Sequence, residues 1–184
     1  IHRMSTLKVS TISPLGTDAT KTITLGSAGD VVAGAGANTP SFHVNNLFSS
    51  SVSGSGDQDI SNNTNTLVNF TNKVFDTDSA FDTTTMRFTV PTGQAGKYFF
   101  ETSGALNSSS DFDGTELQLR VNNSTVSVAR ARNENQEILK TALVVNLSVG
   151  DYVDIYIYQN SGGTVAWRGN SNERFFQGYK LIGA

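Results

Sequence analysis

The chain of 184 residues contains no cysteine and only three prolines. The absence of cysteine excludes disulfide bonds, on which many small secreted animal domains rely, and therefore favours a bacterial or viral origin. Charged residues make up 16% of the chain, against ~25% in an average soluble domain. The low charge, together with abundant Ser, Thr, Asn and Gly, is typical of short strands joined by turns and argues against long helices.

Three classes of protein are excluded by further absences. The 13 basic residues are scattered and the net charge is −3, whereas binding to a phosphate backbone needs clustered Lys and Arg. No apolar run approaches the ~18–20 residues of a membrane-spanning helix, and no signal peptide is visible. Seventeen glycines are too few for a collagen stalk, which has Gly at about a third of its positions. We therefore expect no nucleic-acid partner and no membrane span.

Residues able to carry catalysis are also scarce. An enzyme needs a positioned acid, base or nucleophile, and the chain has two histidines, His2 and His43. A catalytic triad would have to use His43, in a short strand beside a linker. The sequence Ser53-Gly54-Ser55-Gly56 does not match the Gly-x-Ser-x-Gly nucleophile elbow, and two histidines without cysteine argue against zinc. We predict a non-enzymatic protein with no catalytic residues.

Calcium is the one cofactor that the sequence leaves open. Asp111 and Asp113 stand at alternate positions before Gly114, which is part of a calcium-loop pattern without the rest of the twelve-residue frame. A second acidic turn spans residues 76–82. Because Asp-Gly turns also occur without metal, we name Asp111 and Asp113 as calcium candidates only.

The chain is predicted to have three parts. Residues 1–33 contain two or three short alternating strands, which cannot bury enough surface alone and must dock on the main domain, on sister chains or on another protein; a disordered tail is the alternative. Residues 34–40 form a Gly/Ala linker without side chains to pack. Residues 41–184 show strands at intervals of roughly 8–15 residues and no helical period, which predicts an all-β sandwich or jelly roll.

The stretch 150–158 is central to this prediction. A turn at Gly150-Asp151 leads into a strand in which Val153, Ile155 and Ile157 share one face. The opposite face carries Tyr152, Asp154, Tyr156 and Tyr158. This second face is too aromatic for solvent and too polar for a closed core, and Tyr suits a protein–protein contact because its ring buries area while its hydroxyl keeps a polar partner. We predict that it packs against a neighbouring chain.

Five segments, in order, carry a resemblance to a known family. They are Leu67–Phe70 with Phe75 and Phe81-Asp82, Phe88–Pro91 with Gly96–Phe100, Leu119–Asn123, Leu147–Val153, and Phe176–Tyr179 with Leu181. Together they resemble the C1q globular domain, a relative of the tumour-necrosis-factor jelly roll, although the cysteines and the collagen repeat of C1q proteins are missing. The resemblance implies a homotrimer around a three-fold axis. Near that axis we expect Tyr152, Tyr156 and Tyr158, with Phe176 or Tyr179 from the last strand.

The N-terminal part resembles something else. Residues 6–12 and 23–30, Thr-Leu-Lys-Val-Ser-Thr-Ile and Ile-Thr-Leu-Gly-Ser-Ala-Gly-Asp, are similar to segments of marine tailed-phage structural proteins, which precede adhesive or jelly-roll tips. This resemblance implies a location on the virion surface, with residues 4–33 attached to a capsid or tail protein.

Two roles follow on the virion, a capsid decoration protein or head fibre, and a tail-fibre tip that binds a host cell-surface glycan. A chain that starts at Met4 and has no long shaft favours the first role. A soluble C1q-like lectin is the alternative outside the virion. Candidate glycan or receptor contacts are Trp167 and Arg168, with Arg130 and Arg132 from a charged loop; Trp167 fits a core position equally well.

Overall fold

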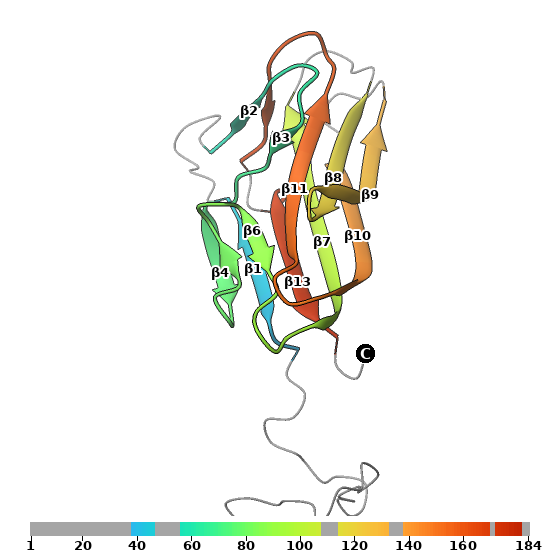
Figure 1. Ribbon diagram of the computed structural model, residues 1–184. Helices are drawn as coiled ribbons and strands as arrows, with labels where there is room; N and C mark the ends of the chain where they lie inside the picture. Colours follow the sequence, from blue (N-terminus) through green and yellow to red (C-terminus); the bar gives the residue numbers. More distant parts are fainter. Residues whose placement is uncertain (1–37, 47–55, 108–113, 133–137, 170–171, 182–184) are drawn as a thin grey trace, which may run out of the picture. The chain divides into compact units, whose positions relative to one another are not determined.

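The computed structural model describes residues 38–46, 56–107, 114–132, 138–169 and 172–181 (Figure 1). All of them belong to the second of two units of the chain, Gly36–Ala184. The predicted attachment segment at 1–33 and the calcium candidates Asp111 and Asp113 lie outside the described residues, so those predictions stay predictions.

Within these ranges every regular element is a strand, and the predicted all-β class is confirmed. The strands are β1 (Ser41–Asn45), β2 (Gln58–Ile60), β3 (Thr66–Leu67), β4 (Asn72–Asp76), β5 (Phe81–Asp82), β6 (Arg87–Thr89), β7 (Gly96–Asn107), β8 (Thr115–Val121), β9 (Ser124–Ala131), β10 (Ile138–Leu147), β11 (Tyr152–Gln159), β12 (Val165–Trp167) and β13 (Phe175–Lys180). The described part of the chain contains no helix long and apolar enough to span a membrane.

The strands form two antiparallel sheets (Figure 1). The larger has the order β2-β12-β7-β13-β1-β4, and β10 pairs with the edge of β7 that lies opposite β13. The smaller has the order β5-β6-β11-β8-β9, with β3 also paired to β11. The strand predicted within residues 150–158 is therefore β11, in the middle of the smaller sheet.

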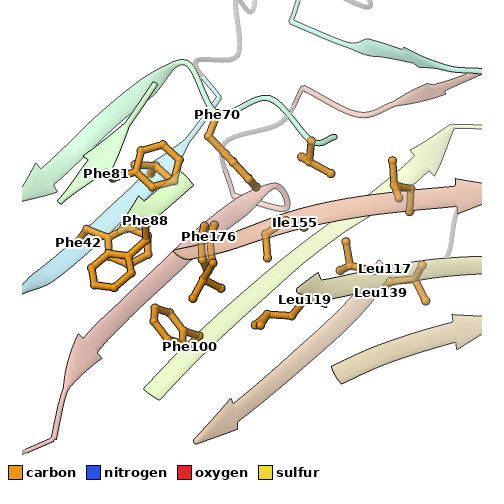
Figure 2. Close-up of a cluster of buried hydrophobic side chains, with 14 of the residues drawn as sticks. Phe42, Phe70, Phe81, Phe88, Phe100, Leu117, Leu119, Leu139, Ile155 and Phe176 are labelled. Atoms are coloured by element: carbon orange, nitrogen blue, oxygen red, sulfur yellow. The ribbon is translucent and has the colours of Figure 1, made fainter. Parts of the chain in front are cut away.

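The core lies between the two sheets and is rich in phenylalanine (Figure 2). Phe42 of β1 stacks on Phe88 of β6 with ring centroids 5.0 Å apart, and it meets Phe176 of β13 edge-on at 4.9 Å. Further along the sandwich the core becomes aliphatic, with Leu117, Leu119, Leu139 and Ile155. Burial of side chains this large is the main favourable term in folding, and it fixes which face of each strand points inward.

The predicted hairpin turn at Asn122-Asn123 is present between β8 and β9. Both residues have positive φ, 48° and 68°, as the two central positions of a type I′ turn require. Asn tolerates this conformation better than most residues with a side chain. The turn places the exposed loop end of the hairpin beside Asp151, whose Oδ1 accepts a 2.8 Å hydrogen bond from the side-chain Nδ2 of Asn122.

Candidate functional site

The two faces of β11 have the characters that the sequence predicts. Val153, Ile155 and Ile157 are completely buried in the core. On the outer face, the guanidinium of Arg87 lies 4.1 Å from the ring centroid of Tyr152, and that of Arg120 lies 4.3 Å from the centroid of Tyr156. These are cation–π distances, so the two tyrosine rings are each covered by an arginine of a neighbouring strand.

Asp154 lies between the two stacked pairs and is completely buried. Its Oδ2 accepts a 3.0 Å hydrogen bond from Arg87 Nε, while Oδ1 has no hydrogen-bond partner among the described residues. Burial raises the pKa of Asp154, and the hydrogen bond and charge of Arg87 oppose the rise without cancelling it. Tyr158, at the end of the strand, donates from its hydroxyl to Asn63 Oδ1 at 2.9 Å. The three tyrosines on the outer face of β11 thus each contact a residue of their own chain and remain partly exposed.

The outer face of the larger sheet is different, because several of its apolar side chains are exposed. Val144 of β10, Phe99 of β7 and Tyr179 of β13 form one cross-strand row, and the rings of Phe99 and Tyr179 are 5.3 Å apart. The relative exposure is 56% for Val144 and 37% for Tyr179. At the opposite edge of the sheet, Phe75 of β4 is 48% exposed.

A polar chain of contacts crosses the middle of the same face. The Nδ1 atom of His43 lies 3.0 Å from Gln177 Oε1, and Gln177 Nε2 donates to Glu101 Oε2 at 2.7 Å. The ammonium of Lys140 binds the other oxygen of Glu101. Burial alone would raise the pKa of Glu101, but the hydrogen bonds from Lys140 and Gln177 outweigh it and hold that pKa below its ordinary value. His43 also stacks on the ring of Phe175, with centroids 5.7 Å apart.

The residues predicted to surround the three-fold axis do not share one surface. Tyr152, Tyr156 and Tyr158 lie on the outer face of the smaller sheet, whereas Tyr179 lies on the outer face of the larger one. Phe176 is completely buried in the core of its own chain, so its side chain is not available to a partner and this part of the prediction needs correction. The alternation along β13 turns Phe175 and Tyr179 outward and Phe176 inward.

Trp167 is a core residue and not an exposed ligand contact. Its carbonyl accepts a 3.0 Å hydrogen bond from Arg174 Nη1. Arg174 is itself completely buried, and its Nη2 donates to the Gly56 carbonyl at 2.8 Å. Burial lowers the pKa of Arg174 to about 10, and the charge of Asp57 opposes the fall. No pattern in the sequence marks Arg174 as a buried side chain, so sequence reasoning gave it no role.

Of the remaining ligand candidates, Arg168 lies 3.4 Å from Glu173 in an ion pair. Arg130 and Arg132 instead share a cavity at the end of the smaller sheet, with a volume of about 170 Å³. It is lined by Gly114, Thr115, Glu116, Arg130, Ala131, Arg132, Tyr158 and Asn160. The structure thus brings two of the four predicted ligand contacts together and adds Tyr158, which the sequence had placed at a subunit interface.

Among the described residues, no group of three or more acidic or His side chains is arranged to hold a metal ion. The acidic turn at residues 76–82 uses its carboxylates for the turn itself. Asp76 accepts hydrogen bonds from the backbone N–H groups of Ala80 and Phe81 at 2.9 and 3.2 Å, and Asp82 accepts one from the N–H of Thr84 at 2.7 Å. These contacts give the carboxylates a structural role.

A family model for the C1q domain matches residues 51–181. The chain belongs to the C1q domain family. The resemblance drawn from the five sequence segments is thereby confirmed, and the fold is that of the C1q and tumour-necrosis-factor jelly rolls. C1q domains are generally non-enzymatic binding or structural domains, in agreement with the scarcity of catalytic side chains in the sequence.

Three solved structures illustrate the likeness of this C1q domain. The globular domain of zebrafish complement 1qA protein aligns with a TM-score of 0.51 and 17% identity, covering 78% of this chain and 98% of that one. Eiger TNF from S. frugiperda aligns with a TM-score of 0.58 and 14% identity, covering 78% of this chain and 93% of that one. Murine APRIL aligns with a TM-score of 0.56 and 12% identity, covering 77% of this chain and 98% of that one. No curated protein sequence matches. At these identities the likeness concerns the fold.

Proposed function

We propose that this C1q domain is the trimer-forming, non-enzymatic binding head of a virion surface protein. We also propose that its subunits meet through the outer face of the larger sheet. The observation that carries the proposal is the exposure of large apolar side chains on that face, above all Val144 and Phe75. Exposed apolar patches are typical of protein interaction sites, and the row of Val144, Phe99 and Tyr179 forms such a patch, whereas the rings of Tyr152 and Tyr156 on β11 already contact Arg87 and Arg120.

The arrangement of these side chains suits a ring of subunits. Val144 lies on the β10 edge of the sheet and Phe75 on the β4 edge. When two different patches of one chain contact each other between neighbours, the contact is heterologous, and it closes into a ring if the rotation allows. Domains of the C1q and tumour-necrosis-factor families form homotrimers, which supports a ring of three. The polar chain from His43 to Lys140 would then fix the orientation of the subunits.

The oligomeric state tests this proposal. Light scattering coupled to gel filtration is expected to give the mass of a trimer for the wild-type chain. The substitution Val144→Glu should release monomers because it places a charge in an apolar contact. Val126→Glu is the matched control, since Val126 is 44% exposed but lies on β9 of the smaller sheet, and it should remain trimeric. A wild-type monomer at micromolar concentration, or a Val144→Glu trimer of unchanged stability to dilution, would contradict the proposal.

The virion location rests on the resemblance of the N-terminal segment to phage structural proteins. In the first role, residues 4–33 dock on the capsid shell and the C1q head decorates it. The cavity beside Arg130 and Arg132 favours the second role, a tail-fibre tip that contacts a host cell-surface glycan. Gold-labelled antibody against the C1q domain, imaged on intact particles, separates the two by labelling the head or the tail. If neither the head nor the tail is labelled, the virion location is wrong and the soluble lectin is the remaining role.

A further inference from the structure

The cavity at the end of the smaller sheet is formed by three strand ends. Thr115 and Glu116 begin β8, Arg130 and Ala131 end β9, and Asn160 directly follows β11. Its volume of about 170 Å³ is below the ~300–1,000 Å³ of sites that hold drug-sized molecules. It therefore suits a ligand no larger than a single ring.

Two side-chain oxygens of residues that line this cavity have no hydrogen-bond partner among the described residues. They are the hydroxyl oxygen of Thr115 and the side-chain oxygen of Asn160, and both are buried. Buried polar atoms in native proteins are nearly always hydrogen-bonded to protein, water or ligand. The Asn160 oxygen can only accept, while the Thr115 hydroxyl can donate or accept. A ligand that serves both atoms must offer at least one hydroxyl or N–H donor.

The charges of the cavity leave one cation unused. Arg130 Nε donates to Glu116 Oε1 at 2.7 Å, and Gln118 Nε2 donates to Glu116 Oε2 at 2.9 Å, so both oxygens of this carboxylate are engaged. Arg132 is exposed and has no ion pair or hydrogen bond with any described residue. Guanidinium groups bind carboxylates strongly, often through two parallel hydrogen bonds. The cavity thus combines two oxygens that can accept hydrogen bonds with the guanidinium of Arg132, which can bind an anion.

We propose that this cavity binds a carboxylate-bearing monosaccharide unit, such as a terminal uronic acid of a surface polysaccharide. The sugar carboxylate would pair with Arg132, ring hydroxyls would serve Asn160 and Thr115, and the aromatic side chain of Tyr158 would provide an apolar wall. An acidic peptide side chain offers the carboxylate but not the neighbouring hydroxyls. The inference gives a ligand class to the binding role proposed above and rests on that role.

The test uses the full-length, isotope-labelled chain and follows its backbone amide signals by NMR. The probes are methyl galacturonoside and methyl galactoside, which differ in the carboxylate. The acidic sugar is expected to shift the amides of Thr115, Arg130, Arg132 and Asn160, and the neutral sugar should bind about tenfold more weakly, since a hydrogen bond to a charged group is lost.

Three variants locate the contacts. Arg132→Gln should weaken binding of the acidic sugar about tenfold and leave the neutral sugar unchanged, because the variant removes the charge alone. Thr115→Val, which keeps the side-chain shape, should weaken binding of both sugars. Lys73→Gln, which removes an exposed cation of β4 outside the cavity, is the control and should change neither.

Three results would overturn the inference. They are the absence of shifts at the cavity amides at millimolar sugar, equal affinity for the two glycosides, and equal or tighter binding of N-acetylglutamate. Light scattering on the same samples separates this inference from the trimer proposal. A monomer that binds the acidic sugar would refute only the trimer, and a trimer that does not bind it would refute only the ligand.

Discussion

Gly104 of β7 lies directly against the indole ring of Trp167 on β12. A Cβ atom placed on Gly104 would lie 2.0 Å from Cζ2 and 2.6 Å from Cε2 of that ring. Trp167 is completely buried, so the ring could make room for a Cβ atom only by displacing its neighbours or leaving the core. The absence of a side chain at residue 104 is therefore a condition for packing β12 against the long central strand β7.

We expect Gly104→Ala to destabilise the domain by about 2–3 kcal/mol, because added volume in a packed core forces side chains from their preferred positions. Gly163→Ala is the matched control, since a Cβ at Gly163 meets no atom within 4 Å, and it should lie within ~0.5 kcal/mol of wild type. Urea unfolding at a fixed protein concentration measures both. Equal midpoints for the two variants would show that the indole adjusts without cost.

The pH dependence of stability should carry the signature of Asp154. Burial raises its pKa in the folded chain, against the opposing effect of Arg87. Between the unfolded and the folded pKa the folded state binds more protons, so this carboxyl makes the free energy of unfolding fall as the pH rises through that window. Asp154→Asn should remove this component of the pH profile while keeping a hydrogen-bond acceptor for Arg87.

Asp151 provides a control of opposite sign. Hydrogen bonds from Asn122 and from the backbone of Ser148 lower the pKa of Asp151, so its contribution to stability is present above the unfolded pKa and is lost as the pH falls through the folded pKa. Urea midpoints of the wild type, Asp154→Asn and Asp151→Asn between about pH 3 and 7 measure both effects. Profiles that change in the same direction for the two variants would refute this assignment.

Two tyrosines distinguish the two sheet faces as subunit interfaces. Tyr179→Ser should weaken the trimer, because Tyr179 packs on Phe99 within the exposed apolar row. Tyr156→Ser should leave the trimer intact, because the ring of Tyr156 contacts Arg120 of its own chain. Dissociation measured by light scattering during serial dilution separates the outcomes. Loss of the trimer in Tyr156→Ser alone would return the interface to the outer face of β11.

The turn between β8 and β9 should accept glycine at its second position. Asn123 has a φ of 68°, a conformation that glycine adopts without steric cost, and Asn-Gly is the preferred type I′ pair. Asn123→Gly is expected to stabilise the domain by up to about 1 kcal/mol, and Asn123→Val to destabilise it by about 1–2 kcal/mol. Ser124→Gly, one residue into β9, should instead destabilise by about 0.5–1 kcal/mol. Thermal unfolding of the three variants decides, and a loss of stability in Asn123→Gly would contradict the turn assignment.

Much of the fold could be predicted from local patterns. The alternation in Tyr152–Tyr158 identified both the strand and its buried face, and Asn122-Asn123 identified a turn, because strand alternation and turn preference depend on neighbouring residues. The same reasoning failed for Phe175-Phe176, where two adjacent aromatics gave no indication of which one faces the core. It also did not decide whether Trp167 is buried, since its burial depends on the missing side chain at Gly104, which lies 63 positions earlier in the sequence.

The sequence by itself determined the all-β class, the C1q resemblance and the inner face of β11, since each follows from residues that are close along the chain. Tertiary structure alone decided what covers the outer faces. Arg87 and Arg120 reach Tyr152 and Tyr156 only because β6 and β8 pair with opposite edges of β11. In the part of the chain that the structure describes, Val144 and Phe75 remain about half exposed. Strand pairing sets side chains from distant positions beside one another, and a linear pattern does not contain that information.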